Sequence, residues 1–301
     1  MDNLMKNIIL TPLNYLYAIS PELELKLMFR LKQGYNLNLK NPVTYNEKLQ
    51  WIKLYDHNPL MPKCCDKYAV RSYVEDKGCG AILNELIWEG MNPEEIPFDK
   101  LPRQCVIKVT HGSTFNIICT DTSKLDRHDV IEKCRKWLKA KFLPCYGEWF
   151  YGRIEPRIII EKYLEDGHGK DLFDYKVFCF NGKAKLIDVH SGRFGEHLRN
   201  IYDLDWNLQE DVYFKYGHAP VIDKPKALSL MIQYAEILSS DFYHARVDFF
   251  IVNDQVYFGE ITFTNGAGFD RIEPHCFDEK MGSWLKLPLK PEHQSKTRKL
   301  F

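Results

Sequence analysis

The spacing of apolar residues changes character about one third of the way along the chain. In the first hundred residues, apolar positions recur at helical spacing, and capping residues, prolines and glycines mark where helices begin and end. These signals predict helices over residues 20–34, from the capping-box sequence Thr44-Tyr45-Asn46-Glu47 onward, and over residues 66–78. The amino-terminal part of the chain is therefore predicted to be helical.

From Gln104 onward, apolar and polar residues alternate over short segments, which is typical of strands. We predict strands over residues 106–109 and 116–119 and a helix over residues 126–142. A second unit follows, with strands near residues 157–164, 174–180 and 183–190, a helix over 225–238 and a closing hairpin over 244–263. This order of elements predicts an α+β fold with mostly antiparallel sheets.

Composition narrows the class of protein. Lys plus Arg and Asp plus Glu both total 41, so no net charge attracts the whole chain to nucleic acid or to an anionic membrane. The nine cysteines are odd in number and form no Cys-x-x-Cys pair, which argues against a zinc knuckle or a disulfide framework. The apolar stretch over residues 8–19 contains Pro12 and is too short to span a bilayer, although it could rest against a membrane. We expect a folded cytoplasmic protein.

The closing hairpin is the most informative segment, because polar side chains interrupt its aromatic strands. Arg246 and Asp248 share one face of the outgoing strand, since side chains alternate along a strand. Glu260 and Thr262 share one face of the returning strand for the same reason. Whether the two faces coincide depends on the turn.

Two geometries are open for that turn. A strict two-residue turn at residues 253–254 pairs Asp248 with Gly259 and places Glu260 on the other side, whereas a three-residue loop or a bulge at Gly259 brings the acids together. If they meet, two carboxylates in an apolar sheet repel each other unless a cation lies between them. Such oxygen ligands suit magnesium or manganese held together with nucleotide phosphates. The alternative is an exposed face with an ordinary Arg–Asp ion pair.

Three further segments are candidates for nucleotide contacts. Lys108 ends a strand before the small-residue loop His111-Gly112-Ser113, which can offer N–H groups to phosphate, although an ordinary hairpin has the same pattern. Lys67 lies at a helix start, where the helix dipole favours an anion, so either a bound anion or simple solvation explains it. The apolar strand that ends in residues 161–164 either presents backbone groups to an adenine ring or simply reaches the surface.

Taken in order, these segments resemble the ATP-grasp superfamily, and in detail its teichuronopeptide-biosynthesis-like (TupA-like) branch, over about residues 21–287. The resemblance is carried by Asn41-Pro42-Val43-Thr44-Tyr45-Asn46-Glu47-Lys48-Leu49-Gln50-Trp51, Asp66-Lys67-Tyr68-Ala69-Val70-Arg71, Lys108 with His111-Gly112-Ser113, Gly147-Glu148-Trp149, Ile160-Glu161-Lys162-Tyr163-Leu164, Asp174-Tyr175-Lys176, Phe180-Asn181-Gly182-Lys183, Arg246-Val247-Asp248 and Gly259-Glu260-Ile261-Thr262-Phe263.

The resemblance implies an ATP-grasp fold of the α+β class, in which two α+β subdomains clamp ATP. It divides the chain into a helical amino-terminal region (1–65), a small subdomain with the phosphate loop (66–150), a large subdomain with the metal-binding hairpin (151–289) and a tail (290–301).

The resemblance also implies roles for individual residues. The phosphates of ATP would be bound by Lys67, Lys108, Gly112 and Ser113, and the adenine pocket would be formed by Glu161, Lys162, Tyr163, Leu164 and Lys176. Two magnesium ions, or manganese ions in their place, would be held by Asp248, Glu260 and Thr262, and Arg246 and Lys108 would act on the transferred phosphoryl group.

Two positions depart from the family pattern. Thr262 stands where ATP-grasp ligases usually have a metal-binding asparagine, and Asn265 is a substitute for it. Thr114 stands where a further glycine of the phosphate loop is expected.

The activity that the resemblance implies is ATP-dependent, ADP-forming ligation of a carboxylate to an amine through an acyl phosphate. The family context implies a uronic-acid carboxylate in a bacterial surface polysaccharide, an amino acid or simple amine as acceptor, and contact with membrane-bound polysaccharide enzymes. Arg193 and Arg271 are candidates for binding a substrate carboxylate, or else are surface arginines. We expect Asp248→Asn and Glu260→Gln to abolish turnover without unfolding the protein, because each removes a repelling carboxylate.

Three other functions stay open. The tripeptide Asp203-Leu204-Asp205 is typical of glycosyltransferases that hold a metal and a sugar nucleotide, although it is also expected by chance. A non-catalytic nucleotide-binding protein of polysaccharide biosynthesis and a small-molecule kinase are the remaining alternatives. The products of the reaction distinguish them.

Overall fold

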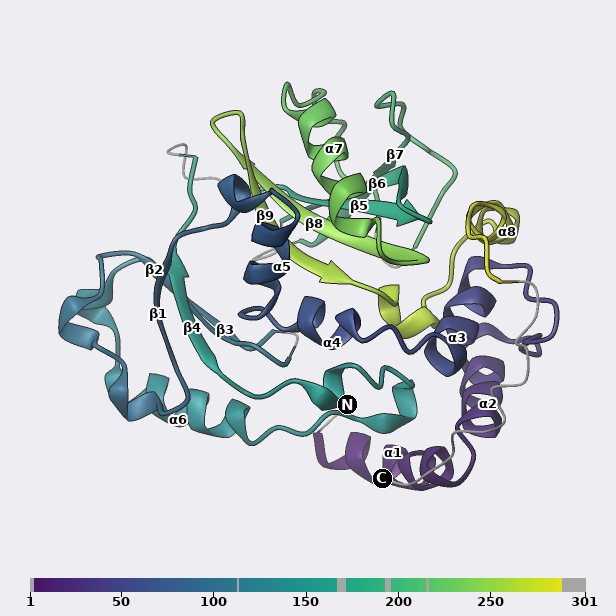
Figure 1. The fold of residues 1–301 in the computed structure, drawn as a ribbon, viewed down its shortest axis with the longest axis horizontal. Coiled ribbons are helices and arrows are strands. Elements are labelled where there is room, and N and C mark those ends of the chain that lie inside the picture. Colours follow the sequence, from purple (N-terminus) through teal and green to yellow (C-terminus); the bar gives the residue numbers. More distant parts are fainter. Residues whose placement is uncertain (1–2, 113, 167–171, 193–195, 215–216, 289–301) are drawn as a thin grey trace.

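Two antiparallel sheets organise the chain. The computed structural model describes residues 3–112, 114–166, 172–192, 196–214 and 217–288. The first sheet has the strand order β1 (Leu86–Gly90), β4 (Ile158–Lys162), β2 (Cys105–Val109) and β3 (Asn116–Cys119). The second has the order β7 (Leu198–Tyr202), β6 (Lys183–Ser191), β5 (Asp174–Phe180), β8 (His244–Val252) and β9 (Gln255–Thr262). The two sheets lie at different ends of the molecule (Figure 1).

The first sheet has a small core of its own. Ile107, Ile158 and Ile160 are fully buried, and they pack with Val130 and Cys134 of helix α6 (Arg127–Leu138). Asp126 caps this helix, since its side chain accepts a hydrogen bond from the Asp129 N–H. Strand alternation and the apolar stripe of one helix are thus enough to build this sheet.

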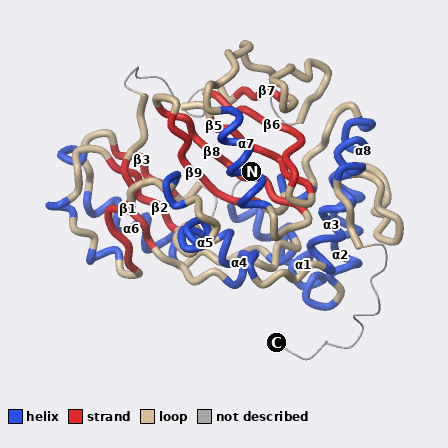
Figure 2. The backbone as a smooth tube through the Cα atoms, turned by 45° about the horizontal axis from the view of Figure 1, so that its top comes forward, coloured by secondary structure: helices blue, strands red, loops and turns tan. Residues whose placement is uncertain are grey.

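The second sheet is covered on both faces, and its core is continuous with the amino-terminal helices. Helix α7 (Leu228–Ser239) contacts β5, β6 and β8 on one face (Figure 2). On the opposite face, Phe178 and Phe180 of β5 pack against Tyr45 of helix α3 (Tyr45–Tyr55), and Phe180 also packs against Trp284 of helix α8 (His275–Trp284). The helices therefore cover one part of this face.

The amino-terminal region consists of α1 (Asn3–Ile19), α2 (Pro21–Gln33), α3, α4 (Leu60–Cys65) and α5 (Val70–Asp76). The predicted capping box is present, because Thr44 accepts a hydrogen bond from the Glu47 N–H and the Glu47 side chain accepts one from the Thr44 N–H. Gly34 ends α2 in the left-handed conformation, with φ of 85°. The α4–α5 segment then passes between the two sheets (Figure 1), where α4 contacts β9.

The predicted α+β class is confirmed, while some expected boundaries differ. Strand β4 pairs with β1 and β2, whereas the predicted division at residue 151 grouped it with the second sheet. The helix expected over residues 66–78 begins only at Val70, after a turn in which the Asp66 carboxylate accepts hydrogen bonds from Tyr68 and Ala69. Strands β1 and β7 and helix α8 were not predicted.

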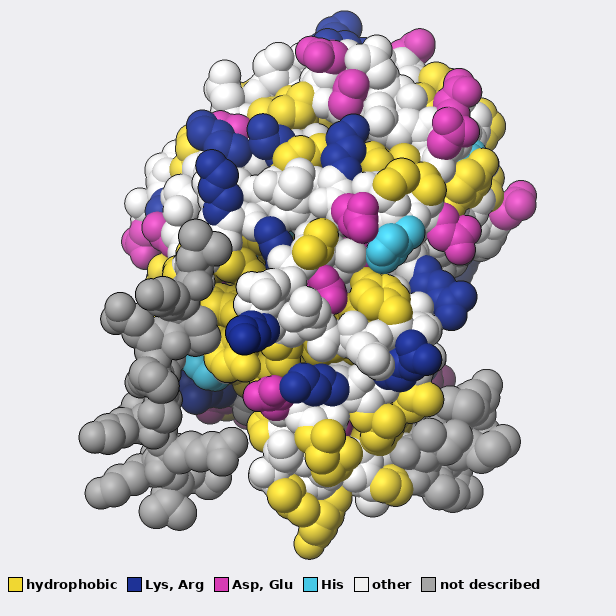
Figure 3. Space-filling view, turned by 90° about the vertical axis from the view of Figure 1, so that its right-hand side faces the viewer, with side chains coloured by type: hydrophobic (Ala, Val, Ile, Leu, Met, Phe, Trp, Pro, Cys, Tyr) yellow, Lys and Arg dark blue, Asp and Glu magenta, His cyan; other side chains and the backbone are white. Residues whose placement is uncertain are grey.

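The surface mixes charges of both signs. Figure 3 shows Lys, Arg, Asp and Glu interspersed on the side that carries α2 and α8, with hydrophobic side chains gathered at its lower end. The exposed hydrophobic side chains of α1 and α2 include Tyr15, Ile19, Leu23, Leu27 and Leu31. No helix within the described ranges is long and apolar enough to span a bilayer.

Candidate active site

A bulge in the closing hairpin places its two acidic residues side by side. Val252 pairs with Gln255 around a tight two-residue turn, and both turn residues have positive φ. Continued in strict register, that turn would pair Asp248 with Gly259, but the register shifts by one residue there and Asp248 pairs with Glu260. A Cβ at Gly259 would lie 2.9 Å from the Asp248 carbonyl oxygen, so glycine is what permits this close approach.

The oxygen atoms on this face converge on one positive group. Nη2 of Arg246 lies 2.8 Å from Oδ2 of Asp248, 3.1 Å from Oγ1 of Thr262 and 3.4 Å from Oε1 of Glu260. Nη1 of Arg246 donates to Oδ1 of Asn265 at 2.6 Å, so the expected substitute for the family asparagine belongs to the same group of atoms.

These oxygen atoms could also be the ligands of a hard divalent cation. They belong to carboxylate, hydroxyl and amide groups, and they already surround the positive charge of Arg246. Among the described residues, no three His, Cys, Asp or Glu side chains form a metal-binding group. A magnesium ion that is held together with nucleotide phosphates needs only one or two carboxylates from the protein.

Asp248 is buried among cations. Arg246 contacts it bidentately, with Nε 2.7 Å from Oδ1, and Lys176 forms an ion pair with it. Lys176 also lies 2.7 Å from Asp174, two residues earlier on β5. Burial raises the pKa of Asp248, and Arg246 and Lys176 oppose that shift. We refer to Asp174, Lys176, Arg246, Asp248 and Glu260 as the Asp248 cluster.

This arrangement corrects one expectation for the variants. The Asp248 side chain is 3% exposed, and it is the counter-ion of Arg246 and Lys176, so its removal leaves buried cations unpaired. The Glu260 side chain is 44% exposed and is partly solvated. We therefore withdraw the prediction of unchanged stability for Asp248 and keep it as a prediction for Glu260 alone.

Lys67, in the α4–α5 turn, lies near enough to Glu260 for each residue to shift the pKa of the other. Nζ of Lys67 donates to the carbonyl oxygen of Gly112 at 2.9 Å, which joins this turn to the predicted phosphate loop. Burial and, to a lesser degree, Lys108 lower the pKa of Lys67, while Glu260 opposes the shift. The pKa of Glu260 is lowered despite burial, chiefly by Lys67 and then by Lys176 and Arg246. The two sides of the site thus influence each other electrostatically.

The first sheet contributes a second group of charges, which we call the Glu161 cluster. Nζ of Lys108 lies 2.6 Å from Oε2 of Glu161, and Nη1 of Arg71 lies 3.2 Å from Oε1 of the same carboxylate. Nη2 of Arg71 also donates to the carbonyl oxygen of Asn84 at 2.8 Å. Arg71 belongs to the Asp66–Arg71 sequence that carried the family resemblance, but we predicted no role for it.

The predicted adenine segment runs from β4 into the following loop. The backbone groups of Lys162 already form hydrogen bonds within the protein. Its N–H donates to the carbonyl oxygen of Glu85, and its carbonyl oxygen accepts a hydrogen bond from the Asn84 side chain at 2.8 Å. Adenine recognition by this segment would therefore rely on Glu161, Tyr163 and Leu164, and the last two are half-buried.

The remaining predicted residues lie elsewhere or outside the described residues. Arg271 is exposed, and its Nε donates to the carbonyl oxygen of Lys32 at the end of α2. Ser113 and Arg193 lie outside the described residues. Asp203 closes a local turn, because its carboxylate accepts hydrogen bonds from the backbone N–H groups of Asp205 and Asn207.

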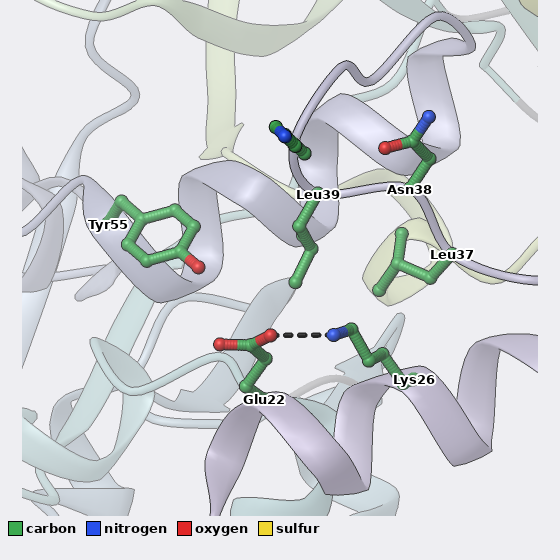
Figure 4. A pocket seen from close by; sticks show the side chains of 7 residues that line it. Glu22, Lys26, Leu37, Asn38, Leu39 and Tyr55 are labelled. Atoms are coloured by element: carbon green, nitrogen blue, oxygen red, sulfur yellow. Dashed lines mark hydrogen bonds and ion pairs between the residues drawn. The ribbon is translucent and has the colours of Figure 1, made fainter. Parts of the chain in front are cut away.

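A shallow groove of about 300 Å³ lies between α2 and the loop before α3, away from the hairpin. Figure 4 shows its lining, in which the ion pair of Glu22 and Lys26 faces Leu37, Leu39 and Tyr55. Both members of that pair are about half exposed, so the pair contributes little stability. We assign no part of the site to this groove.

The two sheets, with the acidic hairpin in one and the lysine-bearing strand in the other, define an ATP-grasp fold. Residues 47–286 match the family described as TupA-like ATPgrasp. The chain belongs to the TupA-like ATP-grasp family.

Solved structures with a similar fold include a D-alanine–D-alanine ligase from Bacillus anthracis complexed with ATP, with 17% identity, a TM-score of 0.41, and coverage of 67% of this chain and 55% of that one. An L-amino acid ligase from Bacillus licheniformis has 15% identity, a TM-score of 0.45, and coverage of 77% of this chain and 51% of that one. The chain thus spans little more than half the length of these structures. A search of the curated proteins found no match.

Proposed function

We propose that the protein is an ATP-dependent, ADP-forming carboxylate–amine ligase. The observation that supports this most directly is the pairing of Asp248 with Glu260 across the Gly259 bulge. Lys67, which is bonded to Gly112 of the predicted phosphate loop, lies near enough to lower the pKa of Glu260. A pair of carboxylates beside a lysine suits a metal-bound triphosphate, because the carboxylates can hold the metal ion while the metal ion and the lysine balance the negative charge of the phosphates.

In this proposal, the residues of the site divide between metal and nucleotide. Asp248, Glu260 and either Thr262 or Asn265 hold two magnesium ions, or manganese ions in their place. When bound, these ions neutralise the charge that develops on the transferred phosphoryl group.

The nucleotide is held by groups from both sheets. Lys67, Lys108 and the Gly112–Ser113 loop bind the phosphates, and Lys108 exchanges its ion pair with Glu161 for a phosphate oxygen. The adenine lies against residues 161–164, with Lys176 lining the same pocket.

Arg246 orients the reacting group. Its guanidinium is rigidly held by Asp248 and Asn265, and this placement suits a group that stabilises charge on the γ-phosphoryl oxygens during transfer. The γ-phosphoryl group moves from ATP to a substrate carboxylate oxygen, which gives an acyl phosphate and ADP. The amine nitrogen then forms a bond to the acyl carbon, and the bond to phosphate breaks.

The family context supports a proposal for the two substrates. We propose a uronic acid of a bacterial surface polysaccharide as the carboxylate and an amino acid or simple amine as the acceptor. The reaction would take place in the cytoplasm, in contact with membrane-bound polysaccharide enzymes. Arg193 and Arg271 remain candidates for the substrate carboxylate, although Arg271 would have to release its hydrogen bond to Lys32.

A screen of uronic acids against amino acids tests this function. We expect release of both ADP and phosphate that requires ATP, a divalent metal and both substrates. ADP without phosphate would indicate a kinase, and a nucleoside diphosphate released from a sugar nucleotide would indicate glycosyl transfer. Binding of magnesium ATP without turnover of any pair would favour a non-catalytic protein and contradict the ligase.

A further inference from the structure

A second group of polar residues lies on the same face of the second sheet as the Asp248 cluster. Asp188 on β6 pairs with Lys176, which pairs in turn with Asp248, so these three residues form one row across the sheet. His190 pairs with Asp174 in the next row. Because adjacent strands lie about 4.8 Å apart, Asp188 is two strands, or about 10 Å, from Asp248.

Asp188 begins a chain of hydrogen bonds that runs through two histidines. Nε2 of His190 lies 2.9 Å from Oδ2 of Asp188, and Nε2 of His197 lies 2.9 Å from Nδ1 of His190. Asp188 is fully buried, His190 is 8% exposed and His197 is half-buried. This histidine chain, made of Asp188, His190 and His197, therefore leads from the core toward the surface.

The ionised state of Asp188 fixes the direction of these hydrogen bonds. Although burial acts to raise it, the pKa of Asp188 is lowered by Arg199 and His190, and Nε of Arg199 lies 2.9 Å from Oδ1. An ionised carboxylate only accepts, so His190 donates from Nε2. In neutral His190, Nδ1 is then an acceptor, so His197 donates from Nε2. The basic nitrogen of neutral His197 is consequently Nδ1.

Charge balance does not explain the two histidines. Arg199 already forms a bidentate pair with Asp188, which satisfies the buried carboxylate. The histidines add a proton acceptor that is polarised by a buried negative group, an arrangement that recurs where a base must be oriented. The histidine chain and the Asp248 cluster share one face of the sheet, so a substrate that is phosphorylated beside the cluster would lie over the same face as the histidines.

We propose that the histidine chain is the binding site for the acceptor amine and that His197 removes its proton. This inference rests on the proposed ligase function. The amine nitrogen forms a bond to the acyl carbon, the bond from that carbon to phosphate breaks with its electron pair leaving on phosphate, and a proton passes from nitrogen to Nδ1 of His197. His190 and Asp188 are positioning residues that orient His197 and stabilise its protonated form. The acceptor class is a primary amine.

The test compares two nucleophiles with different need for a base. Hydroxylamine is largely unprotonated at neutral pH and attacks acyl phosphates without assistance. An alkyl amine is mostly protonated at that pH, so it has to lose a proton before its nitrogen can attack. The assay uses the uronic acid and amino acid that give the fastest ADP release in the screen above, and then hydroxylamine in place of the amino acid. It measures amide, hydroxamate and ADP.

We expect His197→Gln to lower kcat for amide formation by about 10²-fold or more while hydroxamate formation is unchanged. His190→Gln should show the same pattern with a smaller loss. The deficit should shrink with amines of lower pKa, which a purely structural role would not produce. His128→Gln, on the exposed surface of α6, is the matched control and should behave as wild type.

Equal loss of amide and hydroxamate in the His197 variant would contradict this inference, because it would indicate damage to phosphoryl transfer or to the fold. Unchanged amide formation would contradict it as well. The ligase itself fails differently: the wild-type protein would then form neither amide nor hydroxamate with any pair in the screen, and this inference would fail with it.

Discussion

The two sheets each carry a group of charges toward the proposed nucleotide, but the balance of charge is opposite. In the Glu161 cluster, the cations Lys108 and Arg71 face one carboxylate. In the Asp248 cluster, three carboxylates share two cations. The first is suited to a phosphate and the second to a metal ion.

The two clusters also differ in the burial of their charged side chains and in the number of ionic partners that hold them. Lys108 is 27% exposed and, within the described part of the chain, forms an ion pair only with Glu161, so it can turn toward a ligand at small cost. Lys176 and Asp248 are almost completely buried and have several partners, so they form a fixed support. Metal sites depend on such fixed ligands, whereas phosphate binding tolerates a flexible lysine.

The largest expected effect belongs to Asp248→Asn. This substitution removes a metal ligand and leaves Arg246 and Lys176 without their shared counter-ion. We expect activity to fall by about 10³-fold and the free energy of unfolding to fall by about 3–5 kcal/mol. Steady-state kinetics measures the loss of activity, and urea unfolding measures the loss of stability. A variant as stable as wild type would show that Arg246 and Lys176 do not need Asp248 as their counter-ion.

Glu260→Gln should separate catalysis from stability. We expect a similar loss of activity, about 10³-fold. Because the Glu260 side chain is 44% exposed and its ion pair with Arg246 is partly solvated, the unfolding free energy should fall by no more than about 1 kcal/mol. Asp254→Asn, at the turn of the same hairpin, is the control and should leave both unchanged. Near-normal turnover in the Glu260 variant would remove it from the proposed metal site.

The pH dependence of stability tests whether His244 of the second sheet is shielded from water. Burial lowers the pKa of His244 to about 4, from an ordinary value of 6.5, although its hydrogen bond to the Phe263 carbonyl opposes the shift. Between these values the unfolded chain binds a proton that the folded protein does not. Stability should therefore decline as the pH falls from 6.5 toward 4, by about 3 kcal/mol from this residue.

The measurement is the unfolding free energy of wild type and His244→Gln as a function of pH. The wild type should lose more stability than the variant over that interval. Equal slopes would show that water reaches His244 and that the burial of this face is incomplete.

The smallest effect is expected on the side of the first sheet. Lys108→Gln should raise the KM for ATP by about tenfold, which corresponds to about 1.4 kcal/mol, with little change in the KM of the other substrates. Lys124→Gln, in the exposed turn that follows β3, is a matched control with the same change of charge. An identical increase in both variants would reflect general electrostatics rather than a specific contact.

Much of the second sheet and of its hairpin could be predicted from the sequence. Alternation alone placed Asp248 and Glu260 on defined faces, and the structure has the bulge at Gly259 that unites those faces. Pattern could not choose between bulge and strict turn, because the choice depends on close contact between Gly259 and the Asp248 backbone.

Contacts between segments that are distant in the chain could not be predicted from local sequence patterns. The partners of Glu161, the strand β7 and the hydrogen bonds of Asp188 depend on segments that are distant in the chain or on neighbours that no local pattern identifies. Arg71 could have been found from its place in the Asp66–Arg71 sequence, because that segment carries the family resemblance and Lys67 of the same segment was assigned a role. The residues around His190 offered no such signal.

Helix α3 packs against residues near the carboxy-terminal end of the chain, and this contact has a consequence for folding during synthesis on the ribosome. Asn46 of α3 bonds to Asp278 of α8, and Gln50 bonds to the carbonyl oxygen of Gly268. The first sheet, formed within residues 86–162, can close before the carboxy-terminal part emerges, whereas α3 has to wait for it. Helix α3 is therefore translated early but is among the last elements to pack into the folded protein.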